Sequence, residues 1–260
     1  MPTIISPYSL AQTYTRNGDL DPWARVQEYR RVQTYQNDHP QKGSHAIATA
    51  LDLPRSRIRP WVDNNSRPDP ARAIDTAREL GWTNIDTDTP DGLAWTRLVA
   101  WIYAGGSLSQ DDYRPTFFAR TNQNGALAKP EVDVLTTALQ TVGVDYRFKR
   151  RREQRPEDGS EFRATEIVPT EHRVLLGRCL AAAGAPIGEK NDTHPEHLPE
   201  WLAESSANTR RAFARIYLLT RATIREHEPR FSIREKRPES YHRELVTLVE
   251  DLAGPDTISR

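Results

Sequence analysis

Apolar residues recur at helical spacing near the start of the chain. Trp23, Val26, Tyr29, Val32 and Tyr35 follow one another at intervals of three, and the sequence Asp-His-Pro at 38–40 then ends the run. Proline removes a backbone donor and clashes with the preceding turn, so a helix cannot continue through it. The pattern therefore predicts one helix between Trp23 and Asn37.

Further helices are expected from Ser44 onward and over 70–80, where Gly81 is a candidate C-cap. Residues 1–22 are polar and are predicted to form an N-terminal arm, and the acidic stretch at 83–91 is the predicted linker between domains. The first domain is accordingly assigned to residues 23–84 as an all-helical unit.

Beyond the linker, helical runs and strand-like runs mix, which predicts an α+β fold for the remainder. The helices are expected over 93–104, 131–142, 171–183, 198–204, 208–222 and 240–252, and the strands over 113–120, 145–154, 160–168 and 230–234.

An internal repeat organises this second part. The segment from Gly105 aligns with the segment from Arg221: in both, a helix end is followed by a hydroxyl residue, a polar loop and Pro-x-Phe. Ser107 then matches Thr223. Duplication of a helix–strand unit explains the match, and chance similarity is the alternative.

Composition narrows the class of protein. The 260 residues are 37% hydrophobic, include a single cysteine, Cys179, and have no apolar run near the roughly 18 residues that span a bilayer. No internal disulfide, membrane span or signal peptide is expected, which favours the cytoplasm.

The charges of the 36 basic and 36 acidic residues sum to zero, but six of the nine residues at 147–155 are basic. This segregation indicates a surface for an acidic partner.

Residues 47–62 have the apolar spacing of a helix-turn-helix. Ala48 is small where two helices would cross, Ile58 and Trp61 face inward, and Asp52 occupies the turn. Aspartate tolerates the left-handed backbone conformation that such a turn needs. Pro60 is expected to shorten or kink the second helix.

Basic side chains follow this turn and suggest contact with DNA. Arg55, Ser56 and Arg59 are expected to enter the major groove, where an arginine fork donates to both acceptors of guanine. Arg57 and Arg67 are expected to contact phosphates. The alternative is a helical hairpin with a solvated basic face.

A second basic surface is predicted on the strands, where Tyr146 and Phe148 are expected to face the covering helices while the intervening residues point outward. An ordinary solvated strand face is the alternative. The outward residues of the two repeats are Arg147, Lys149, Arg151, Arg230, Ser232 and Arg234.

The helix Leu98–Ser107 resembles the signature helix of LAGLIDADG homing endonucleases, and Phe213–Thr223 resembles its second copy. The connector Pro186–Leu202 is similar to the glycine-x-lysine connector of that family. The resemblance implies an αββαββα repeat over 91–190, followed at 191–260 by a connector and a partial second repeat. It also implies two paired signature helices beneath a sheet that holds DNA.

In that family an acidic residue at the end of each signature helix binds a divalent cation. The matching positions here are Gly105 and Arg221, which supply no carboxylate. The resemblance therefore implies a protein without nuclease activity, metal or cofactor. Asp111, Asp112 and Glu228 are the nearby acids that an active enzyme would use instead.

The combination resembles WhiA-type regulators, which pair a degenerate endonuclease domain with a helix-turn-helix in the opposite order. We therefore expect a sequence-specific protein that binds double-stranded DNA and regulates transcription. A homodimer is one way to complete the truncated second repeat. The alternatives are an active homing endonuclease and a module that binds an acidic protein.

Overall fold

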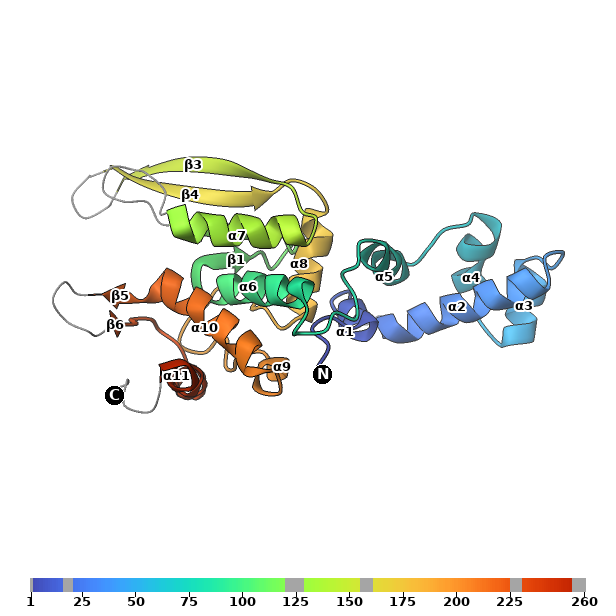
Figure 1. Ribbon diagram of the computed structural model, residues 1–260. Helices are drawn as coiled ribbons and strands as arrows, with labels where there is room; N and C mark the ends of the chain where they lie inside the picture. Colours follow the sequence, from blue (N-terminus) through green and yellow to red (C-terminus); the bar gives the residue numbers. More distant parts are fainter. Residues whose placement is uncertain (1, 16–20, 120–128, 155–160, 225–230, 254–260) are drawn as a thin grey trace. The chain divides into compact units, whose positions relative to one another are not determined.

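The computed structural model describes residues 2–15, 21–119, 129–154, 161–224 and 231–253 (Figure 1). The chain divides into two compact units, one formed by residues 6–83 and the other by residues 1–5 together with 84–260. The mixed α+β class expected from the sequence is confirmed.

The unit of residues 6–83 is helical. Its long central helix packs against the four other helices. The five helices are α1 (Pro7–Gln12), α2 (Pro22–Asp38), α3 (Ser44–Leu51), α4 (Arg55–Asp63) and α5 (Asp69–Glu79).

Local sequence explains where α2 begins and ends. The Asp21 side chain accepts a hydrogen bond from the Ala24 backbone at 2.8 Å and Pro22 starts the helix, while His39 leaves the helical conformation before Pro40. Val26 and Val32 are fully buried, and the Tyr29 ring meets Trp61 of α4 edge-on at 5.6 Å. The predicted apolar stripe is therefore the face that holds α4.

Residues 2–15 are more structured than the expected arm. Leu10 and Ala11 of α1 are fully buried, and α1 packs on α2 and α5. Before α1, the Ile4 backbone donates to Ile85 at 3.1 Å and Thr3 forms a β-bridge with Asp86. The first residues thus belong to the second unit and pair with the segment that follows α5.

The second unit alternates helices and strands. The order runs helix–strand–strand–helix–strand–strand–helix and then starts again with a helix. The helices are α6 (Pro90–Gly105), α7 (Lys129–Thr141), α8 (Arg173–Ala182), α9 (Glu200–Ala203), α10 (Ala207–Arg221) and α11 (Glu239–Ala253), and the strands are β1 (Gly106–Leu108), β2 (Pro115–Ala119), β3 (Tyr146–Gln154), β4 (Glu161–Pro169), β5 (Thr223–Ile224) and β6 (Phe231–Ser232).

Helix α6 is the centre of this unit. It packs against α10, α7 and α8, and its residues from Leu98 to Ala104 are all buried (Figure 1). Helices α6 and α10 are also joined near their N-termini. There the Asp88 carboxylate, just before α6, accepts hydrogen bonds from Ser206 and from Thr209, the latter at 2.9 Å. Because Ser206 also caps α10, the two long helices are tied together where both begin.

Four antiparallel strands form the larger sheet in the order β1-β2-β4-β3. Phe117 is paired with Ile167, and both are fully buried on the face that α6 and α8 contact. The second sheet has two strands, in which Thr223 pairs with Ser232. In both aligned segments a short strand begins within two residues of the end of a long helix, where the sequence predicted a polar loop.

The hairpin turn between β1 and β2 lies close against α8. A methyl group on Gly177 would lie 1.5 Å from the Tyr113 carbonyl oxygen, and the Arg178 guanidinium lies 4.1 Å from the Tyr113 ring centre. Tyr113 itself has a positive φ of 56°. Only glycine at 177 permits this approach.

Candidate functional site

The helical hairpin of α3 and α4 turns within three residues. Asp52 takes the left-handed conformation, with φ 53° and ψ 49°, and the Leu53 backbone donates to Ala48 at 3.0 Å. Ile58 and Trp61 are buried, as predicted. Helix α4 continues through Pro60 to Asp63, so this proline does not end it.

The first turns of α4 present polar side chains to solvent. Arg55, Ser56 and Arg59 are all exposed. The Arg59 side chain is 68% exposed and lies 3.6 Å from Asp63, a distance at which an exposed pair contributes little. These three side chains are therefore available to a partner, and they extend from one end of a single short helix.

Arg57 is engaged within the protein. Its Nη1 atom donates to both oxygens of Glu28 at 2.8 and 3.0 Å, and its side chain is only one third exposed. It connects α4 to α2, so the expectation of a phosphate contact at Arg57 is not supported. Arg67 is half exposed and lies 3.7 Å from Asp75 of α5.

The larger sheet carries the second group of predicted residues. Directly paired residues of antiparallel strands share a face of the sheet. Lys149 and Phe118 both pair with Glu166, so these three residues share one face, and Phe117, the neighbour of Phe118, lies on the other. Lys149 lies 3.6 Å from Glu166, which is buried, while Arg147 is exposed. The backbone of Arg151 continues β3, and nothing of its side chain is described.

Phe148 lies on the predicted face of the sheet, because it pairs with the buried Ile167, but its side chain is 46% exposed and is not covered. The strand β3 lies at the edge of the sheet, so its register places Phe148 on the same face as Ile167 but beyond the buried core. In the second repeat, Ser232 pairs with Thr223 and Arg234 is exposed, while Arg230 lies outside the described residues.

The two positions matched to the missing carboxylates lie at the ends of α6 and α10. A methyl group on Gly105 would lie 3.4 Å from the side chain of Thr220, the neighbour of Arg221. The two helix ends are thus brought together.

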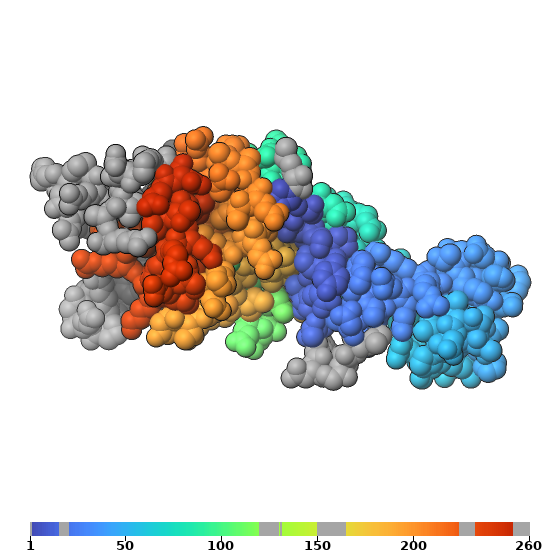
Figure 2. Space-filling view, turned by 90° about the horizontal axis from the view of Figure 1, so that it is seen from below, coloured from blue at the N-terminus to red at the C-terminus, as the bar shows by residue number. Residues whose placement is uncertain are grey.

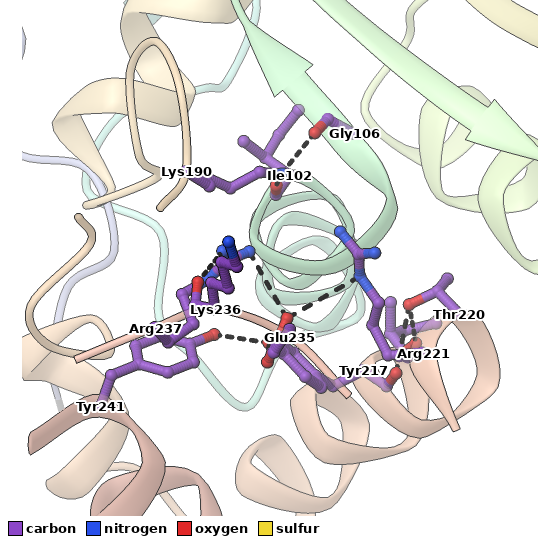
Figure 3. Close-up of polar contacts among 11 residues, drawn as sticks. Ile102, Gly106, Lys190, Tyr217, Thr220, Arg221, Glu235, Lys236, Arg237 and Tyr241 are labelled. Atoms are coloured by element: carbon purple, nitrogen blue, oxygen red, sulfur yellow. Dashed lines mark hydrogen bonds and ion pairs between the residues drawn. The ribbon is translucent and has the colours of Figure 1, made fainter. Parts of the chain in front are cut away.

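Lys190 closes the end of α6. Its ammonium group donates to the carbonyl oxygens of Ile102 and Gly106, both at 2.5 Å (Figure 3). The last carbonyls of a helix lack helical partners and carry partial negative charge, which a lysine satisfies. Burial lowers the pKa of Lys190 to about 7, and the nearby charges of Arg221 and Arg237 add to this effect while Glu235 opposes it.

Glu235 lies among these basic side chains. Its carboxylate is 4% exposed and lies 3.4 Å from Arg237 and 3.9 Å from Nε of Arg221. Tyr217 donates its hydroxyl proton to the same carboxylate and accepts a hydrogen bond from Tyr241 at 2.9 Å. Burial and the Glu235 charge raise the pKa of Tyr217, so this tyrosine remains a donor.

We call Lys190, Arg221, Glu235 and Arg237 the cationic cluster. It contains three basic side chains and one carboxylate, and Figure 3 shows them gathered around the end of α6. The sequence singled out Arg221, and Lys190 is the lysine of the glycine-x-lysine connector, but no pattern predicted that these two residues meet Glu235 and Arg237. Glu235 and Arg237 belong to a charged run that reads as a solvated surface, and no periodic pattern links them to Lys190.

The acids proposed for an active enzyme lie elsewhere or outside the described residues. Asp112 pairs with Arg114 at 3.1 Å in the turn between β1 and β2, and the Ser109 side chain holds its pKa below the usual range. Asp111 is exposed in the same turn, and Glu228 is not described. The described part of the chain contains no group of three His, Cys, Asp or Glu side chains placed to hold a metal ion.

His197, in the segment before α9, is engaged within the protein. His197 pairs with Glu244 of α11 at 2.6 Å, and this contact raises the pKa of His197. Figure 2 shows α11 beside the segment that contains α9 and α10.

Among the described residues, no helix is long and apolar enough to cross a membrane. Comparison with protein-family models, curated proteins and solved structures finds no match to this chain.

Proposed function

We propose that this chain binds double-stranded DNA sequence-specifically, acts as a transcriptional regulator, and does not cut the DNA. The observation that carries the proposal is the exposure of Arg55, Ser56 and Arg59 on the first turns of α4, directly after a three-residue turn. A helix of this kind fits the major groove, and arginine forks discriminate guanine from other bases.

The lack of cleavage follows from the charge at the helix ends. A divalent cation needs oxygen ligands, preferably carboxylates, between the two helices. Lys190, Arg221 and Arg237 place positive charge there, and the carboxylate of the cationic cluster, Glu235, is already engaged by Tyr217 and two arginines. This arrangement supports a degenerate member of the LAGLIDADG group that holds DNA without a catalytic metal.

The sheet supplies a second surface for the same ligand. Arg147 and Lys149 extend from an edge strand, and a basic strand contacts phosphates without reading bases. In this proposal α4 provides the sequence preference and the sheet provides affinity. A homodimer would extend both contacts to two half-sites about 34–36 Å apart.

Fluorescence anisotropy on pools of genomic fragments tests the proposal. We expect selected fragments to bind at least tenfold more tightly than random duplex. Arg55→Ala and Arg59→Ala should each weaken binding to the selected fragment by roughly 5- to 150-fold, equivalent to about 1–3 kcal/mol. Arg72→Ala is the matched control, because Arg72 is exposed on α5 and pairs only locally with Asp69.

Equal binding to selected and random DNA would remove the sequence-specific part of the proposal. A separate incubation of the bound fragment with magnesium or manganese tests cleavage. The expected result is intact DNA. A double-strand break that Asp111→Asn, Asp112→Asn or Glu228→Gln abolishes would identify an active endonuclease instead.

A further inference from the structure

Arg221 is held on one side only. Its Nε atom faces Glu235 at 3.9 Å, and its two terminal nitrogens point away from that carboxylate, alongside the end of α6 (Figure 3). The side chain is 37% exposed. Within the described residues no hydrogen bond to these terminal nitrogens is found, so none of those residues occupies the fork of the guanidinium.

Among the described residues, the charged side chains around Arg221 are more often basic than acidic. Arg237 has a side chain only 4% exposed and shares Glu235 with Arg221. The Nε atoms of both arginines are buried without a hydrogen-bond partner in the described part of the chain. Concentrating like charges away from water is unfavourable unless a counter-charge is present.

Lys190 shows the effect of this imbalance. It contacts the same helix end, is buried, and is repelled by the two guanidinium groups, while Glu235 is the described carboxylate that attracts it. An anion bound at the Arg221 fork would reduce this repulsion at all three basic residues.

We propose that the cationic cluster is a metal-free phosphate-binding site, in which the Arg221 fork binds two oxygens of a phosphate group while Lys190 and Arg237 contribute charge from behind. The planar fork of arginine matches phosphate geometry, and hydrogen bonds between two ionised groups are the strong ones. The phosphate comes from the DNA backbone, a source that rests on the function proposed above, or from a free phosphate-type anion.

The first arm of the test uses DNA. The salt dependence of binding is measured for the full chain and for Arg221→Gln, since each phosphate contact contributes about 0.9 to the slope of log K against log salt concentration. We expect the variant to lose about 0.9 from this slope. Arg243→Gln is the control, because Arg243 is 70% exposed on α11 and lies 3.5 Å from Glu239; it should leave the slope unchanged.

The second arm uses sulfate, which keeps its double negative charge across the neutral pH range. Low millimolar sulfate, at ionic strength matched with sodium chloride, should raise the thermal unfolding temperature of the wild type and of Arg243→Gln, but not of Arg221→Gln. If sulfate loses its effect in Arg221→Gln while the DNA slope stays at the wild-type value, the site holds free anions rather than DNA.

The two proposals fail separately. If the wild type does not bind DNA, the proposed function fails and the sulfate arm alone decides the phosphate site. The phosphate site would be overturned if Arg221→Gln kept the wild-type salt slope and sulfate raised its unfolding temperature as much as that of the wild type. Should Arg221→Gln not fold, Arg221→Lys keeps the charge beside Glu235 but lacks the fork, so it should lose most of the sulfate shift; a wild-type shift in that variant would also overturn the site.

Discussion

Arginines that are close in sequence perform different tasks in this protein. Arg55 and Arg59 extend into solvent from α4, whereas Arg57 between them is bound by both oxygens of Glu28. A partly buried hydrogen bond between ionised groups is stronger than an exposed one. The three residues should therefore respond differently to the same substitution.

Arg57→Ala should lower the stability of the helical unit by about 1 kcal/mol, because the partly buried Glu28 loses its partner. Arg55→Ala should leave stability within about 0.5 kcal/mol, the usual range for a surface site. Denaturant unfolding followed by circular dichroism measures both. A double-mutant cycle with Glu28→Ala isolates the pair, and a coupling energy near zero would contradict this role for Arg57.

The lowered pKa of Lys190 makes the free energy of unfolding depend on pH. Its pKa in the folded chain is about 7, below the ordinary value of 10.5, so the unfolded chain binds more protons at this site between these two pH values. Stability contributed by this site therefore rises as pH increases from 7 towards 10.5.

Comparing unfolding midpoints at pH 7, 8 and 9 checks the sign. The wild type should show a rise that Lys190→Met lacks, and Lys42→Met, which removes an exposed lysine, should retain it. An identical rise in wild type and Lys190→Met would mean that Lys190 is not the group responsible.

At the level of elements, two glycines lie where a helix contacts its neighbour. Gly177 of α8 faces the turn between β1 and β2, and Gly105 of α6 faces α10. Gly177→Ala would place a methyl group 1.5 Å from the Tyr113 carbonyl oxygen, so the turn between β1 and β2 must move away from α8. We expect a loss of about 3 kcal/mol or more. Gly105→Ala meets Thr220 and Trp101 at 3.4 Å, an ordinary contact, and should change stability by less than about 1 kcal/mol.

Thermal unfolding of the two variants measures this difference. Equal stability of Gly177→Ala and wild type would contradict the close approach of the turn to α8.

Elements that follow from local sequence were predicted well. The limits of α2 follow from Pro22 and His39, and the left-handed conformation of Asp52 follows from its side chain. Strand alternation identified the face of the sheet on which Phe148 lies but not its exposure, because alternation does not show that β3 is an edge strand. The cationic cluster was missed because Lys190 and Glu235 are distant in sequence, and neither lies in a periodic pattern.

For the whole molecule, the division into two compact units predicts two unfolding transitions. Arg57→Ala lies in the helical unit and should shift one transition, whereas Gly177→Ala lies in the other unit and should shift the second. Differential scanning calorimetry resolves the two. A single transition that both variants shift equally would show that the units unfold cooperatively.

The pairing of Ile4 with Ile85 has a consequence for how the chain is built. Residues 6–83 form an insertion whose two ends leave the host unit from neighbouring backbone positions, rather than a domain added in front of it. The helical unit is therefore excisable in principle: joining residue 5 to residue 84 through a short glycine-rich bridge should leave the host unit folded. The same arrangement means that a ribosome must release residue 86 before the first residues of the chain find their native neighbours.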